Sequence, residues 1–219
     1  AQSDGTDIDI QSRQDLGATI GFSRAFAGNL LKLGVVGKTI IRNQINGVFS
    51  HRSIEALDDT TMPTLFKEGV GFGADLGMLL TIPNRTLPTI GLVWKDVLGT
   101  RFSSGNIINK RASGAPNAIE QTVNAAFSIH PYFSRTFKGT IALEWKHIEQ
   151  NSMPWRKHLK FGIQLEDERS LYFWFGLNQL NPTAGVGLRV KGGNIEAGTY
   201  AEDVGSGSDS KADRRFVFR

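Results

Sequence analysis

The chain lacks cysteine altogether over its 219 residues. A disulfide framework, a thiolate zinc site and a cysteine nucleophile are therefore excluded. Long apolar runs are also missing: a membrane-spanning helix needs roughly 18 or more consecutive apolar residues, whereas the apolar runs here are short, as at Met78-Leu79-Leu80. The sequence is thus neither a cysteine-stapled scaffold nor a helical membrane protein.

Charge of one sign is not in large excess either. Lys and Arg number 25 against 21 Asp and Glu, a net charge of +4. The basic residues are scattered without a Lys/Arg block, so we expect no nucleic-acid partner. Glycine, by contrast, is abundant at 25 residues, above the roughly 7% of average proteins. The glycines are spread along the whole chain, which excludes a collagen repeat and a low-complexity linker.

Alternation with a period of two residues is the strongest pattern, and it is typical of β-strands. In residues 137–145, Ile141, Leu143 and Trp145 fall on one face. Lys138 and Glu144 fall on the other face. The same alternation recurs in residues 19–22, 31–42, 70–82, 89–95, 123–130, 159–166, 171–178 and 186–191, and more weakly in 195–201 and 215–219.

The pattern predicts about eleven strands, many of them longer than the ordinary strand of about 5–6 residues. Tilted strands that cross a membrane need about 9–11 residues. A helical pattern is confined to Ser53–Leu57, where Ser53 is a candidate N-cap.

Short and long connections alternate along the sequence. We expect short turns near residues 27–29, 83–85, 134–135, 167–169 and 192–194. We expect longer or more polar loops at residues 44–67, 98–120, 149–156, 179–183 and 202–213. Such sorting is typical of outer-membrane barrels, which have short periplasmic turns and longer extracellular loops.

These patterns predict an all-β fold, a transmembrane antiparallel up-and-down β-barrel forming one domain over residues 1–219. Its outer face would be apolar and its inner face wet. The aromatic residues near strand ends would form the interfacial girdles: Trp94, Trp145, Tyr132 and Trp155. The alternative is a soluble up-and-down barrel or sandwich, which also has a two-residue period.

Charged residues on the predicted inner face are the best candidates for function, because lumen residues tune what passes through a barrel. Alternatively, residues of opposite sign pair across strands and merely fill a closed barrel. The predicted lumen-lining residues are Asp75, Lys95, Glu144, Lys146, Lys160, Glu166, Arg189 and Lys191.

Catalytic and cofactor motifs are scarce. Ser128 and His130 share a strand face, as in a barrel-borne lipid hydrolase, but no acidic residue stands at a position that would orient the histidine. No metal-ligand spacing is present. The glycines of residues 69–73 precede neither a helix nor a Gly-Lys-Ser/Thr sequence, so a phosphate loop is excluded and alternating glycine on one strand face is favoured. We expect no enzyme, cofactor or metal.

Several short segments resemble PorV-like and FadL-like bacterial outer-membrane proteins over roughly residues 68–219. They are Leu87–Val97, Asn117–Asn124, LKFGIQLE at residues 159–166, FGLN at 175–178, GVGLRV at 185–190 and RRFVFR at 214–219. The resemblance implies a barrel of about fourteen strands in the outer membrane of a Gram-negative bacterium. Outer-membrane lipid and lipopolysaccharide would then be its surroundings.

Two features differ from that pattern. The chain ends at Arg219, three residues after Phe216, where such barrels usually end in an aromatic residue. Eleven strands is also an odd number, whereas single-chain bacterial barrels have an even number. We therefore expect the C-terminal part of a larger barrel that lacks about three strands. The alternative is a twelve-strand barrel in which residues 6–10 form a short first strand.

The resemblance implies two competing functions. The FadL-like reading is a pore or uptake channel for a hydrophobic or small solute. The PorV-like reading is a non-conducting barrel that docks or shuttles exported proteins through its extracellular loops, with another chain as partner. The long loops at residues 44–67 and 98–120 are candidates for such binding. A lipid hydrolase is the least favoured function.

Overall fold

The computed structural model describes residues 8–49, 65–167, 170–205 and 211–219. These residues form twelve strands and one short helix. The elements are β1 (Ile8–Phe26), β2 (Leu31–Phe49), β3 (Lys67–Thr81), β4 (Thr89–Lys95), β5 (Phe102–Ser104), β6 (Thr122–Ile129), β7 (Phe137–Trp145), α2 (Trp155–His158), β8 (Leu159–Asp167), β9 (Leu171–Asn178), β10 (Asn181–Val190), β11 (Gly193–Asp203) and β12 (Ala212–Phe218).

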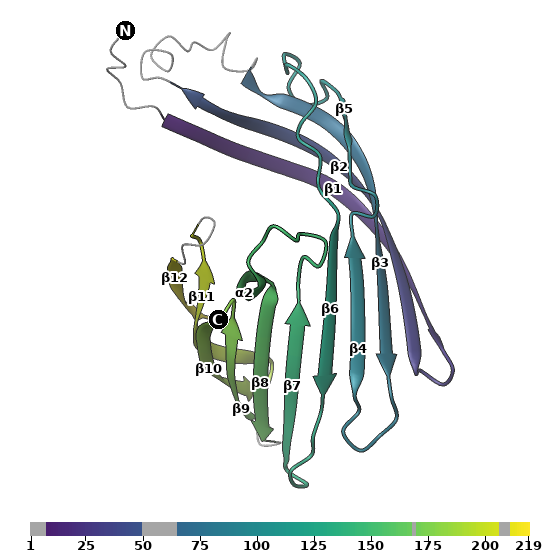
Figure 1. Cartoon of the computed structure of the whole chain (residues 1–219), viewed down its shortest axis with the longest axis vertical. Coiled ribbons are helices and arrows are strands. Elements are labelled where there is room, and N and C mark those ends of the chain that lie inside the picture. The colour runs from purple at the N-terminus through teal and green to yellow at the C-terminus, as the bar shows by residue number, and fades with distance from the viewer. Residues whose placement is uncertain (1–7, 50–64, 168–169, 206–210) are drawn as a thin grey trace. The chain divides into compact units, whose positions relative to one another are not determined.

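The strands belong to one sheet in which sequence neighbours pair (Figure 1). The order runs β1-β2-β3-β4-β6-β7-β8-β9-β10-β11-β12, and β5 pairs with β3 beside this path. The registers from β6 to β12 are all antiparallel. Among the described residues the pairing does not return from β12 to β1, so the sheet is not closed. The predicted all-β antiparallel fold is confirmed.

Several predicted boundaries differ from the structure. Residues 8–10 are not part of a separate first strand, because they begin the long β1. Likewise β2 continues to Phe49, so the predicted loop at residues 44–67 starts later than expected. The predicted helix at Ser53–Leu57 lies outside the described residues.

Two connections were also predicted incorrectly. The loop expected at residues 179–183 is a two-residue turn, in which Gln179 and Leu180 take positive φ angles of 54° and 64°. The connection after β7 contains α2, a helical turn that no periodicity indicates because it has only four residues. The Gln179-Leu180 turn could not be predicted, because positive φ angles usually occur at glycine and neither residue is one.

One face of the sheet is apolar, as the two-residue period predicts. Residues that are directly opposite each other in a ladder lie on the same face. Leu143 is opposite Phe161, Ile163 is opposite Phe175, and Phe173 is opposite Val186. These side chains form continuous apolar rows across neighbouring strands.

The apolar face is largely uncovered. Leu143 is 43% exposed, Phe173 39% and Phe175 51%. Among the described residues, the buried hydrophobic side chains are only Ile45, Phe102, Tyr172 and Ala201. The sheet therefore has no apolar core of the kind that stabilises a soluble domain, where apolar residues are the ones most often buried.

Of the described helices, none has the length and apolar composition that a membrane crossing requires.

The described residues fall into two compact units. The first unit comprises the described parts of residues 1–22, 35–75 and 95–121. The second unit comprises those of residues 23–34, 76–94 and 122–219.

The β9–β10 turn yields a prediction about stability. Leu180 is held in the left-handed region, which costs a side-chain-bearing residue about 1–2 kcal/mol and glycine much less. Leu180→Gly should raise the free energy of unfolding by about 0.5–1 kcal/mol, measured by urea titration in detergent micelles. The control is Leu188→Gly within β10, on the apolar face, which should lower the stability. A loss of stability in both variants would contradict the turn conformation.

Candidate functional site

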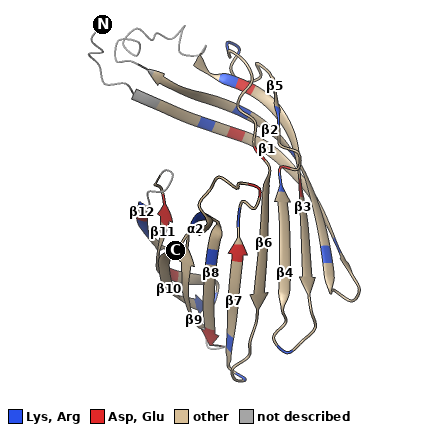
Figure 2. Cartoon of the chain, in the orientation of Figure 1, with Lys and Arg blue, Asp and Glu red and all other residues tan. Residues whose placement is uncertain are grey.

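The face opposite the apolar one carries charged and hydrogen-bonding side chains, and we call it the polar face. In the second unit, the β7–β8 register places Glu144 opposite Lys160 and Lys138 opposite Glu166. The next ladder continues the row by placing Tyr172 opposite Glu166. Charges of both signs therefore lie along β7 and β8 (Figure 2).

A three-residue charge cluster connects three strands of this face. The Glu166 carboxylate lies 2.7 Å from the Arg189 guanidinium and 3.5 Å from the Lys138 ammonium. The Glu166 side chain is only 14% exposed, whereas those of Lys138 and Arg189 are about half exposed. The carboxylate thus lies between two cations that remain accessible to water.

Tyr172 extends this cluster toward β11. Its hydroxyl donates a hydrogen bond to Glu196 over 2.6 Å. The Arg189 guanidinium lies 5.8 Å from the centre of the Tyr172 ring, at the outer limit of a cation–π contact. Four neighbouring strands, from β8 to β11, therefore contribute to one row, in which two hydrogen-bonded pairs meet at the Arg189–Tyr172 contact.

Glycines make room for the aromatic rings of this row. A Cβ atom on Gly187 would overlap the Tyr172 ring, and one on Gly185 would overlap the Trp174 ring. On Gly198, a Cβ atom would approach Trp174 to 2.9 Å. The rings therefore lie against bare backbone, which gives part of the glycine excess a steric reason.

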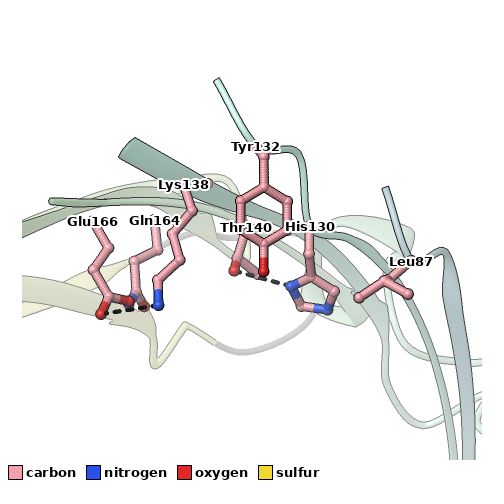
Figure 3. A pocket seen from close by; sticks show the side chains of 8 residues that line it. Leu87, His130, Tyr132, Lys138, Thr140, Gln164 and Glu166 are labelled. Atoms are coloured by element: carbon pink, nitrogen blue, oxygen red, sulfur yellow. Dashed lines mark hydrogen bonds and ion pairs between the residues drawn. The ribbon is translucent and has the colours of Figure 1, made fainter. Parts of the chain in front are cut away.

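A cavity of about 260 Å³ lies beside the charge cluster (Figure 3). The side chains of Tyr132, Lys138, Gln164 and Glu166 line it together with His130. The remaining lining residues are Leu87, Gly139 and Thr140. The lining contains donors, acceptors and both signs of charge, so this hollow suits water and polar solutes better than hydrocarbon.

His130 connects two hydroxyl groups within this region. One ring nitrogen, Nδ1, lies 3.1 Å from the Thr140 hydroxyl, and Nε2 lies 3.5 Å from the Ser128 hydroxyl. The predicted shared face of Ser128 and His130 is confirmed. A catalytic triad would need a group that orients the imidazole, and here Thr140 occupies that position in place of a carboxylate.

The structure separates the eight predicted lumen residues into groups. In the second unit, Glu166 and Arg189 form an ion pair, while Glu144 contacts Lys146 at 3.8 Å and lies opposite Lys160. Lys191 is exposed in the turn after β10. Many of these charges are therefore paired, as the alternative reading expects, without the polar face being sealed from water.

The remaining two predicted residues, Asp75 and Lys95, belong to the first unit. Asp75 accepts a 2.7 Å hydrogen bond from Lys38, which also lies 2.9 Å from Asp96. The Asp96 amide in turn donates to Asp75 over 2.7 Å. Lys95 is exposed at the end of β4.

A second ion pair of the first unit was not predicted. Arg42 binds both carboxylate oxygens of Asp15, at 2.7 and 2.9 Å. Such bidentate pairs are among the stronger charge-assisted hydrogen bonds. Alternation places Arg42 on the polar face of β2, but its partner in β1 depends on a register that the sequence does not reveal.

Other residues of the site were also missed. Lys138 lies on the predicted polar face, but it was not included among the lumen residues. Tyr132 was predicted as a girdle residue, yet it lines the polar cavity. Trp155 begins α2, four residues before β8 starts at Leu159, so it does lie near a strand end as predicted. His130, Thr140 and Gln164 carry no sequence pattern beyond alternation that would bring them together.

Within the described part of the chain, no group of three or more His, Asp or Glu side chains is arranged to hold a metal ion. No protein-family model, curated protein or solved structure matches this sequence.

The aromatic packing gives a testable prediction. Gly185→Ala should lower the free energy of unfolding by about 1–3 kcal/mol, the usual cost of overpacking, because the added methyl group overlaps the Trp174 ring. Gly162→Ala is the matched control on the same face of β8, where nothing lies within 4 Å of an added Cβ atom. Urea unfolding in micelles measures both. Equal stability of the two variants would contradict the close approach of Trp174.

Proposed function

We propose that the chain is an integral β-barrel protein of a bacterial outer membrane, similar to the PorV-like and FadL-like group. It would allow a small polar solute to pass along its polar interior. The observation that carries this proposal is the pairing of an exposed apolar face with a charged, hydrogen-bonded opposite face. In water, exposing a large apolar side chain forgoes about 1.5–3 kcal/mol relative to burying it.

Lipid supplies the missing cover for the apolar face. Soluble monomers rarely expose contiguous apolar patches larger than a few hundred Å². The rows that contain Leu143, Phe161, Ile163 and Phe175 extend over neighbouring strands without any layer packed on them. Hydrocarbon around this face, including the acyl chains of lipopolysaccharide, would solvate it fully, while the polar face would contact water inside the barrel.

Closure is part of the proposal. A free strand edge in hydrocarbon leaves backbone donors and acceptors unpaired, at several kcal/mol for each group. The described path has eleven strands. Since single-chain bacterial barrels have an even number, closing the path would take an odd number of further strands. Pairing of β1 and β12 with those strands would satisfy both edges.

The charge cluster is the proposed contact surface for the solute. Lys138 and Arg189 are accessible on either side of Glu166, next to the 260 Å³ cavity. A polar headgroup or small ion can replace its hydrating water molecules by contacts with these side chains, and it need not cross an apolar barrier. The hydrolase reading is not favoured, because Thr140 and not a carboxylate contacts His130.

A second candidate is a non-conducting barrel that docks another protein through its long connections. The fixed conformation of the β7–β8 connection favours it. His158 is buried, and its ring nitrogens lie 2.6 Å from the Lys146 carbonyl oxygen and 3.1 Å from that of Met153. Its ring also stacks on Trp145. Conductance across a planar bilayer distinguishes the two functions, since a docking barrel carries no steady current.

The two faces of β7 allow a direct test of membrane insertion. Leu143→Arg places a charge on the apolar face, which costs about 2–4 kcal/mol near the middle of a bilayer. Ala142→Arg places the same charge at the neighbouring position of β7, which lies on the polar face. We expect Leu143→Arg to abolish or strongly reduce folding into lipid vesicles and Ala142→Arg to fold, as measured by heat-modifiable mobility on gels. Equal folding of both variants would contradict the assignment of the faces.

Transport makes a separate prediction about ion selectivity. Glu166→Gln removes the anion that neutralises Lys138 and Arg189, so the reversal potential in a KCl gradient should shift toward preference for chloride. Asp167→Asn is the control. It also removes one negative charge, but Asp167 is the last residue of β8 and lies on the other face from Glu166, so the reversal potential should not shift. Identical reversal potentials in both variants would exclude the cluster from the conducting path.

A further inference from the structure

The connection between β4 and β6, residues 96–121, runs along the edge of β3 and places Thr100, Phe102 and Pro116 over the polar face of that strand. We call it the β4–β6 segment. Its short strand β5 pairs with residues Gly69–Gly71 of β3, whereas β4 pairs with β3 only from Leu76 to Thr81. A further bridge joins Thr100 to Ile119 within the segment. Within the first unit, the segment is therefore hydrogen-bonded to β3 through β5 and to itself through the Thr100–Ile119 bridge.

A stripe of three glycines in β3 forms the surface against which the β4–β6 segment packs, and we call this surface its seat. Gly69, Gly71 and Gly73 alternate along β3, on the same face as Asp75. An added Cβ atom would lie 2.8 Å from Pro116 at Gly69, 2.9 Å from the Phe102 ring at Gly71, and 2.9 Å from Lys38 at Gly73. At Gly73 it would also overlap the Thr100 hydroxyl. Any larger residue on the stripe would displace the segment.

The seat is confined to that part of the strand. Gly77 has the same parity as the stripe, yet nothing lies within 4 Å of a Cβ atom added there. On the opposite face, Phe72 is 73% exposed. The segment thus covers the polar face at the stripe and leaves the apolar face of the same residues bare.

Charged side chains hold both ends of the segment. The Arg42 guanidinium lies 4.7 Å from the centre of the Phe102 ring and donates to the Asn117 carbonyl over 3.1 Å. Lys38 binds Asp96, which accepts a 2.6 Å hydrogen bond from the Thr100 hydroxyl. Phe102, an apolar residue on the polar face, is buried between the stripe and Arg42.

A buried carboxylate at the start of β3 holds the middle of the segment, and it belongs to the opposite side of the strand, because Glu68 shares the parity of Phe72 and not that of the glycine stripe. Glu68 is fully buried, and its oxygens accept hydrogen bonds of 2.5–2.7 Å from the amides of Ile107, Ile108 and Asn109. Its own amide donates to the Gly114 carbonyl, and its carbonyl accepts from the Gly105 amide. Burying a carboxylate is costly unless it is hydrogen-bonded in this way, so the bonds require the segment to stay in place.

We propose that the β4–β6 segment is a constriction fixed inside the barrel, which sets the size limit for solutes, and that Gly69, Gly71 and Gly73 determine its position. The inference rests on the proposed function, because a constriction has meaning only if the polar face lines a water-filled path for solutes. It assigns the size limit to Phe102 and the residues that hold it, instead of leaving this segment as a free extracellular loop.

The seating of the segment can be measured without any transport. The chain has no cysteine, and Val70 lies directly opposite Ser103 in the β3–β5 ladder. Opposite residues of antiparallel strands have Cα atoms about 4.5–5.5 Å apart, within disulfide range. Val70→Cys/Ser103→Cys should therefore oxidise to a disulfide in the folded protein. Adding Gly71→Val should abolish most of this cross-link, whereas adding Gly77→Val should leave it intact.

Single-channel conductance of the same variants without the cysteines then tests the constriction. Gly71→Val and Phe102→Ala should conduct more than wild type and should pass larger polyethylene glycols, while Gly77→Val should match wild type. If the cross-link is lost in Gly71→Val but conductance stays at the wild-type value, the constriction is refuted and the pore stands. If neither wild type nor any variant with a released segment conducts, the transport function fails as well. An intact cross-link in Gly71→Val would refute the role of the stripe.

Discussion

The exposed apolar face is the constraint on which the rest of the structure depends. The ion pairs between strands, and side-chain hydrogen bonds that accompany them, lie on the polar face of the sheet. The apolar face has no comparable contacts that would cover it among the described residues. Glu166, Arg189 and Tyr172 connect nearby strands there, whereas Phe173 and Phe175 stay exposed among the described residues. Stability must then come from an apolar medium outside the chain, which is why we propose lipid.

Glycine has two distinct uses on the polar face. In the second unit it accommodates the rings of Tyr172 and Trp174, which lie flat against Gly187 and Gly185. In the first unit it accommodates a whole chain segment over Gly69–Gly73. Both uses bring bulky groups close to the polar face of the sheet.

Alternation in the sequence was enough to predict an all-β antiparallel sheet, most strands and which residues share a face. It identified Glu166, Arg189 and Asp75 as polar-face residues, and it excluded a phosphate loop at residues 69–73. It did not reveal that the Phe102 ring packs against Gly71, because that contact depends on the register between β3 and β5, which are far apart in the chain. The Gln179-Leu180 turn was missed because neither residue favours positive φ, and Glu68 because a buried carboxylate has no local pattern.

Quenching of tryptophan fluorescence by brominated lipids tests the central claim most directly. Trp145 lies on the apolar face, and Trp174 lies on the polar face above Gly185. In single-tryptophan variants folded into vesicles, with the other tryptophans replaced by Phe, Trp145 should be strongly quenched and Trp174 should be protected. Equal quenching of the two residues, or quenching of neither, would contradict a sheet whose apolar face meets lipid and whose polar face meets water.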